Sequence, residues 1–263
     1  MNEKLNLAYK KAIETVNECS NKYGLFASGG KRGYRGVWSR DSMITLISAS
    51  CTSLDSKTIK EAFKRSLITL AKHQSKLGQI PNAVHGFDTN NINVDFQSID
   101  SSLWFILGEY YYKKFYGNEL FVKHKDNIKR ALTWLSYQDM GEDGLLEQLP
   151  TTDWQDAFPH RYGHTINTQA LYYHVLSFVG DKKEQERIKV SIEDEKNTGL
   201  WNGEFYYAYR WKNHNKYKEI GEWFDSLGNL LAIVFGLADE KKSNSILDYI
   251  SDKKINEPYP VKT

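Results

Sequence analysis

Hydrophobic residues recur at helical spacing along most of this chain and alternate with polar and charged positions. The apolar positions are Leu5, Ala8, Ile13 and Val16 in residues 2–22, and Ile59, Phe63, Leu67 and Leu70 in residues 57–75. A pattern of this period predicts an amphipathic helix with one buried and one solvent-exposed face. We therefore expect a helix of that kind in each of these two segments.

A second set of predicted helices is apolar on most sides. These segments begin at Asp41, Asp100, Thr165 and Asp225. Because they carry apolar residues on nearly every face, we expect them to be buried more completely than the amphipathic helices. Asp and Thr are favoured at helix starts, since their side-chain oxygens accept hydrogen bonds from the free N–H groups of the first turn. The four residues are thus expected to cap their helices.

The apolar helices start at intervals of 59, 65 and 60 residues, which indicates a repeated unit. Each unit runs from an apolar inner helix through a short turn to an amphipathic outer helix, and then into a long loop. The loops cover residues 23–40, 77–98, 141–163 and 198–224, and residues 204–211 in the last loop are compatible with a strand pair. Stacked helical hairpins bury a continuous inner surface. The sequence therefore predicts an all-α, toroid-like array with its loops at one end.

The amino-acid composition excludes several classes of protein. The 263 residues are 40% hydrophobic and 26% charged, which is typical of a globular chain and not of a disordered one. A net charge of +2 without a basic tract argues against a nucleic-acid partner. No apolar stretch approaches the length of a membrane span, and the N-terminus is polar and unlike a signal peptide, so we expect a cytoplasmic protein with no membrane partner. Cys19 and Cys51 are expected to be small buried residues in a reducing compartment.

The first long loop combines Trp38, Arg40 and Asp41 at the mouth of an inner helix. An aromatic ring can stack on a sugar, while a guanidinium and a carboxylate make strong hydrogen bonds to neighbouring hydroxyls. These residues therefore form a candidate site for a neutral polyol. In the alternative interpretation, Asp41 only caps its helix and Arg40 pairs with a nearby acid.

The third long loop places Asp153, Trp154 and Asp156 between Pro150 and Pro159, which stiffen the chain on both sides. The pKa of a carboxylic acid beside a tryptophan can be raised by desolvation, as a general acid for a glycosidic oxygen requires. The competing interpretation is an Asx turn with a tryptophan in the core, which is the commoner outcome for such a segment.

No metal or cofactor is predicted. The seven histidines are scattered, and only His160 and His164 are four residues apart, with no cysteine or carboxylate at metal-ligand spacing around them. The glycines of residues 24–33 lack the Lys-Ser/Thr pair that ends a phosphate loop. No sequence marks a nucleophilic triad either.

Five segments together resemble a known family. They are WSRDS at 38–42, GQIPN at 78–82, IDSSLWF at 99–105, DGLLEQLPTTDWQDAF at 143–158 and NTQALYY at 167–173. Their order and spacing resemble those of (α/α)6-barrel glycoside hydrolases, and most of all the amylo-alpha-1,6-glucosidase domain of glycogen debranching enzymes. The resemblance runs from about Gly24 to the C-terminus and carries most of the functional expectation.

The resemblance implies an exo-acting glycosidase that hydrolyses α-glucans or oligosaccharides with inversion, using an acid and a separate base. The position that matches the general acid is Asp156. Positions that match substrate-binding residues are Trp38, Arg40, Asp41, Gln79, Asn82, Asp100, Asp153, Trp154, Asn167 and Gln169. The implied partner is an oligosaccharide or polysaccharide substrate.

The chain departs from the family pattern at two places. Related sequences commonly carry Glu at the position of Asn167, which bears on sugar preference. The family also continues through a Tyr-His-Asn-Gly-Gly segment and further helices with the general base, whereas this sequence ends at Thr263. We count four inner and five outer helices, nine of the twelve in a closed ring, and expect residues 1–263 to form one partial barrel domain. The alternatives are a non-catalytic carbohydrate-binding or scaffold domain, and self-association of an open barrel.

Overall fold

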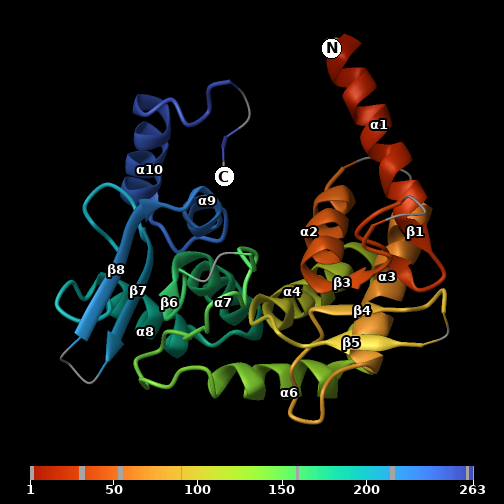
Figure 1. The fold of residues 1–263 in the computed structure, drawn as a ribbon, viewed down its shortest axis with the longest axis horizontal. Helices are drawn as coiled ribbons and strands as arrows, with labels where there is room; N and C mark the ends of the chain where they lie inside the picture. Colours follow the sequence, from red (N-terminus) through yellow and green to blue (C-terminus); the bar gives the residue numbers. More distant parts are fainter. Residues whose placement is uncertain are drawn as a thin grey trace. The chain divides into compact units, whose positions relative to one another are not determined.

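The computed structural model describes residues 3–29, 33–52, 56–89, 91–157, 160–213, 217–258 and 261–262. The chain divides into two compact units, Met1–Trp134 and Leu135–Thr263, and each is described by itself (Figure 1). The expected single domain over residues 1–263 stays a prediction. None of the helices in the described part of the chain combines the length and apolarity of a membrane span.

The first unit is built from helices with short strands between them (Figure 1). Its helices are α1 (Glu3–Cys19), α2 (Ser39–Ser50), α3 (Ser56–Lys72), α4 (Asp100–Tyr116), α5 (Glu119–Lys123) and α6 (Lys125–Ser136), the last of which ends just inside the second unit. Its strands are β1 (Ser20–Asn21), β2 (Gly24–Leu25), β3 (Gly36–Trp38), β4 (Ala83–His85) and β5 (Asn93–Asp95). β1 pairs with β2, and β3, β4 and β5 form an antiparallel sheet in that order.

Helices α2 and α4 begin side by side, because the Ser39 hydroxyl donates a 2.9 Å hydrogen bond to the Ser101 carbonyl. They stay close where Gly108 faces Met43, since a Cβ atom at Gly108 would lie only 2.2 Å from the Met43 sulfur. α3 packs against both helices and contributes the fully buried Phe63. The Glu109 carboxylate of α4 is also buried, 2.6 Å from Nδ1 of His124. The apolar period of the sequence thus produces the core of this unit.

The described residues of the second unit form four helices after α6 and one antiparallel sheet of three strands (Figure 1). The helices are α7 (Ile166–Val179), α8 (Lys182–Glu193), α9 (Ser226–Val234) and α10 (Glu240–Asp252). The strands are β6 (His164–Thr165), β7 (Tyr207–Asn213) and β8 (Tyr217–Phe224), paired in that order. Helices α7 and α9 begin side by side, because a Cβ atom at Gly228 would lie 2.3 Å from the Ile166 side chain.

The all-α prediction is confirmed, and the apolar helices begin at Ser39, Asp100, Ile166 and Ser226, within two residues of the predicted starts. The short strands all lie in or beside the segments expected to be loops. A strand pair was expected only around residues 204–211, where β7 pairs with β8. These short strands are not predicted from the sequence, because they bury too few residues to show the alternating apolar pattern of a β-strand.

The capping prediction is correct for Asp225, whose side chain accepts from the Gly228 N–H at 3.1 Å. It is wrong for the other three helices, because α2, α4 and α7 have Trp38, Ile99 and Thr165 at their N-caps without a side-chain cap bond. The Asp100 carboxylate instead pairs with Arg40, and the Thr165 hydroxyl donates to the Gln148 side chain at 2.6 Å. Asp41 lies inside the first turn of α2 and is exposed.

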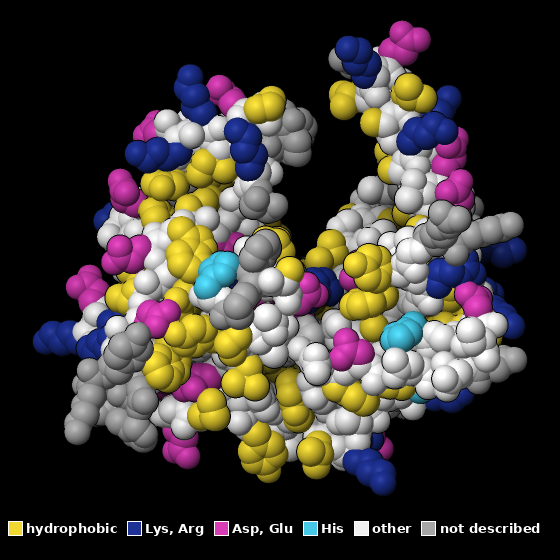
Figure 2. All heavy atoms as spheres, in the orientation of Figure 1, with side chains coloured by type: hydrophobic (Ala, Val, Ile, Leu, Met, Phe, Trp, Pro, Cys, Tyr) yellow, Lys and Arg dark blue, Asp and Glu magenta, His cyan; other side chains and the backbone are white. Residues whose placement is uncertain are grey.

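Helix α1 is exposed along nearly its whole length. Only Cys19 at its end is buried, and Leu5 and Leu7 are 62% and 59% exposed. Figure 2 shows hydrophobic side chains among the charged ones along this helix. Cys51 is exposed as well, so the expectation of two buried cysteines is wrong for this residue. It follows α2 directly, in a turn at the surface.

Candidate functional site

In the first unit the predicted residues gather around the start of α2. One guanidinium nitrogen of Arg40, Nη1, donates to both carboxylate oxygens of Asp100, at 2.9 and 2.7 Å. Ser98 donates to the same carboxylate through its hydroxyl. Asp100 is only 1% exposed, so the Arg40 charge compensates a carboxylate removed from water. This pairing was the alternative interpretation of Arg40, and the structure bears it out.

The sheet β3–β4–β5 brings Trp38 to this cluster, because Trp38 pairs with Ala83, and Ala83 with Asp95. The Trp38 ring meets Tyr34 edge-on, with centroids 5.4 Å apart. Its indole Nε1 is buried and has no hydrogen-bond partner. Buried donors are nearly always satisfied in native proteins, so this unsatisfied donor is unusual.

Gln79 and Asn82 hold the second long loop in place. The Gln79 side chain donates to the Phe96 carbonyl, and the Asn82 side chain donates to Oδ2 of Asp95 at 2.9 Å. The Asn82 carbonyl also accepts from the Ser39 N–H at 2.9 Å, which ties this loop to the start of α2. Both amides therefore position the loop beside Trp38 and Arg40 by contacts within the protein.

A second cluster, in the second unit, centres on Arg161, which sequence reasoning missed. Arg161 is 1% exposed, and its guanidinium donates to Asp225 at 2.7 Å, to Asp153 at 2.8 Å and to Asn167. Burial raises the pKa of the Asp225 carboxyl, and the positive charge of Arg161 opposes that shift. A buried arginine needs anionic partners. No local sequence pattern marks Arg161, although it lies within the acidic third loop.

Asp153 anchors the third loop to this cluster. Its Oδ2 also accepts from the Gln148 side chain at 2.8 Å, and its Oδ1 accepts from the Gln155 N–H at 2.9 Å, which closes an Asx turn. The Asx-turn interpretation is therefore correct for Asp153. Trp154 lies over the Arg161 guanidinium, 5.7 Å from the ring centroid, and its buried Nε1 has no hydrogen-bond partner. The turn thus presents a second unsatisfied indole donor.

The remaining predicted residues of this unit differ in their surroundings. Gln169 is fully buried, and its amide exchanges two hydrogen bonds with the Leu146 backbone, at 3.0 and 2.8 Å, so it supports the loop. Asp156 lies three residues after Asp153 in an exposed turn. It is not buried beside Trp154 as a desolvated acid would be. Pro159, expected to stiffen the loop on its far side, lies outside the described residues.

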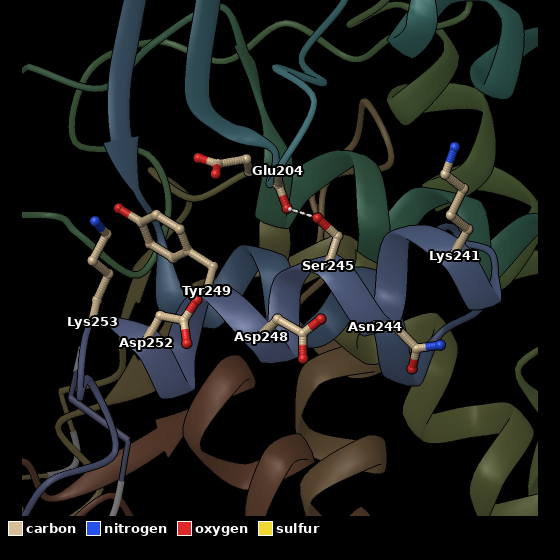
Figure 3. A pocket seen from close by; sticks show the side chains of 8 residues that line it. All are labelled: Glu204, Lys241, Asn244, Ser245, Asp248, Tyr249, Asp252 and Lys253. Carbon is tan, nitrogen blue, oxygen red and sulfur yellow. Dashed lines mark hydrogen bonds between the residues drawn. The ribbon is translucent and has the colours of Figure 1, made fainter.

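Three cavities in the described part of the chain are lined by residues outside these clusters. A cavity of about 370 Å³ lies along α10, where Lys241, Asp248 and Lys253 line it with Glu204 and Tyr249 (Figure 3). Its lining contains none of the predicted site residues. No group of three or more His, Cys, Asp or Glu side chains within the described ranges is arranged to hold a metal ion.

Comparisons with known proteins agree with this architecture. The family model described as amylo-alpha-1,6-glucosidase matches residues 10–259. A search of curated protein sequences found no match to the chain. Among solved structures, a rhamnosidase from Klebsiella oxytoca with rhamnose bound superposes with a TM-score of 0.66 at 14% identity, covering 95% of this chain and 48% of the other. This chain thus spans about half the length of that relative.

A second solved structure, the GH63 mannosylglycerate hydrolase from Thermus thermophilus in complex with glucose, gives a TM-score of 0.62 at 12% identity. The match covers 95% of this chain and 76% of the hydrolase. At such low identity these likenesses establish the helical fold and carry no residue roles.

Proposed function

Since this chain belongs to the amylo-alpha-1,6-glucosidase family, we propose that it acts as a glycoside hydrolase on α-glucans or related oligosaccharides. The family match spans both units and includes every predicted site residue. The finer expectations from the sequence, which are exo-action, inversion and a cytoplasmic location, are part of this proposal.

The observation that carries the proposal is the pair of buried, unsatisfied indole donors. Trp38 Nε1 and Trp154 Nε1 are removed from water and lack a hydrogen-bond partner among the described residues. Each lies beside a charged group, in one case at the start of α2 and in the other against Arg161. A sugar offers both a face for the ring and hydroxyl oxygens that accept from N–H groups. Neutral carbohydrate therefore fits the chemistry of both clusters.

Asp156 is the proposed general acid. The ion pair of Asp153 with Arg161 and the Asx turn to Gln155 fix the loop just before it. Asp156 itself stays exposed, where a leaving-group oxygen can reach it. Its protonated carboxyl would donate to that oxygen as the glycosidic bond breaks. Inversion also requires a second carboxylate, about 6.5–9.5 Å from the acid, to activate water.

The proposal is tested by assaying the 263-residue chain on α-1,6-branched and α-1,4-linked glucooligosaccharides. Asp156→Asn should lower kcat by roughly 100-fold or more, the usual contribution of general acid catalysis. Asp252→Asn at the exposed end of α10 is the matched control and should match the wild type. Equal turnover by Asp156→Asn and wild type would remove Asp156 from this role.

The alternative, a non-catalytic carbohydrate-binding domain, makes a different prediction in the same experiment. Calorimetric titration would then show oligosaccharide binding by the wild-type chain while no substrate is hydrolysed. If neither binding nor turnover occurs, both interpretations fail.

A further inference from the structure

One face of the hairpin formed by β7 and β8 is aromatic. Tyr209 of β7 pairs with Gly221 of β8, and Trp211 pairs with Glu219. Side chains alternate between the faces of a strand, so these four residues share one face. Trp223 lies on the same face, because a Cβ atom at Gly221 would lie 3.0 Å from its ring. Tyr209 and Trp223 are in edge-to-face contact, with ring centroids 5.5 Å apart. We call this surface the hairpin face.

The end of the third loop adds two more rings to the hairpin face. His160 lies against Trp223 with ring centroids 5.4 Å apart. Tyr162 lies 5.7 Å from Trp211 and 5.3 Å from Tyr209 by the same measure. Figure 2 shows a histidine with hydrophobic side chains beside it on this face of the second unit. The five rings form one continuous cluster.

A single carboxylate is held in a fixed position within this cluster. One oxygen of Glu219 accepts from the Tyr162 hydroxyl at 2.7 Å, and the other accepts from the Tyr209 hydroxyl. Each oxygen of a carboxylate can accept more than one hydrogen bond. Two phenol groups thus orient a negative charge among flat apolar surfaces.

The glycine opposite Tyr209 makes this packing possible. A Cβ atom at Gly221 would lie 2.4 Å from the Tyr209 ring and 3.0 Å from the Trp223 ring. Without a side chain at this position, the Tyr209 ring lies directly over the strand and is 4% exposed. Trp223 is 41% exposed, so a ligand can reach its ring.

We propose that the hairpin face binds a sugar unit of a neutral oligosaccharide, with Trp223 stacking on the sugar ring and Glu219 accepting from a hydroxyl. The inference deepens the proposed function and rests on it for the class of ligand. Flat aromatic surfaces combined with an oriented acceptor match the apolar face and hydroxyl edge of a pyranose. A protein partner would instead favour a wider apolar surface without a charge at its centre.

The position of the hairpin face in the chain supports the same ligand. His160 follows Asp156 by four residues in the third loop, and Tyr162 is next to Arg161, which orders the second-unit cluster. A saccharide bound at the hairpin face would therefore lie on the segment that carries the proposed general acid. None of the aromatic residues of the hairpin face is predicted from the sequence to contact a sugar.

Calorimetric titration with maltoheptaose tests this inference. Trp223→Ala should weaken binding by about 3- to 10-fold, the range of one aromatic stacking contact, while Trp223→Phe should retain most of the affinity. Lys218→Ala is the matched control, since Lys218 is exposed on the same strand and its pairing with Lys212 places it on the opposite face. Thermal unfolding of each variant checks that the fold is intact.

Failure of this inference can be distinguished from failure of the proposed function. If no substrate is hydrolysed but Trp223→Ala still weakens maltoheptaose binding, the inference holds and the catalytic proposal fails. If Trp223→Ala binds maltoheptaose as the wild type does, or the wild type does not bind it, the inference is overturned. A change in molecular mass on Trp223→Ala, with unchanged sugar binding, would identify a protein interface and would also overturn it.

Discussion

The Arg161 guanidinium donates to the Asp225 carboxylate at 2.7 Å, and both side chains are 1% exposed although 64 residues separate them in sequence. Arg161 also binds Asp153, so a single cation compensates two buried carboxylates. The third loop and the start of α9 are joined through this contact. The third loop, which carries Asp156, is therefore held in place by Asp225, a residue far from it in sequence.

Replacing Arg161 by Met should destabilise the second unit strongly. The substitution leaves Asp153 and Asp225 buried without a compensating charge, which typically costs about 3–5 kcal/mol. Chemical denaturation measures the loss in free energy of unfolding. Arg187→Met is the control, because Arg187 is 38% exposed and its pairs with Asp139 and Glu184 should contribute at most about 1 kcal/mol. Equal losses for the two variants would contradict the assigned role of Arg161.

A substitution of Asp41 can distinguish a role in sugar binding from a role in stabilising the fold. Asp41 is exposed in the first turn of α2, a helix whose N-cap is Trp38. Asp41→Asn should shift the free energy of unfolding by less than about 0.5 kcal/mol, as for most surface changes. If Asp41 holds a sugar hydroxyl, the same variant should bind oligosaccharide about 10- to 100-fold more weakly, which corresponds to one charged hydrogen bond. Unchanged affinity in titration calorimetry would remove Asp41 from the site.

Glu109 should make the stability of the first unit depend on pH. Burial raises the pKa of this carboxyl above its ordinary value of 4.5, against the opposing effect of the His124 hydrogen bond. The folded state therefore binds more protons than the unfolded state as pH rises from 4.5, and the free energy of unfolding falls through this window. Glu109→Gln keeps an acceptor for His124 and removes the ionisation.

The test compares the free energy of unfolding of wild type and Glu109→Gln between pH 4.5 and the ordinary histidine pKa of about 6.5. The wild type should lose stability more steeply than the variant over this range. Parallel curves would show that Glu109 ionises in the folded state as it does in the unfolded state.

The sequence predicts the helices well, because their apolar residues repeat over many turns. It misplaces the role of Asp100, since a local rule for helix starts cannot anticipate an ion pair with Arg40, 60 residues away. Arg161 has no local signal at all, because its partners are supplied by separate segments. The motif resemblance does select Trp38 and Trp154, yet their unsatisfied indole nitrogens become visible only in the structure.

Helix N-termini that lie side by side require negative charge close to them. α2 and α4 begin together in the first unit, and α7 and α9 begin together in the second. Each helix concentrates about half a positive charge at its N-terminus, so two adjacent starts repel each other. Asp41 and Asp100 in one unit, and Asp225 in the other, place negative charge at these ends. The carboxylates that suit sugar hydroxyls are therefore also the counterions of the helix macrodipoles, which ties binding chemistry to helix polarity.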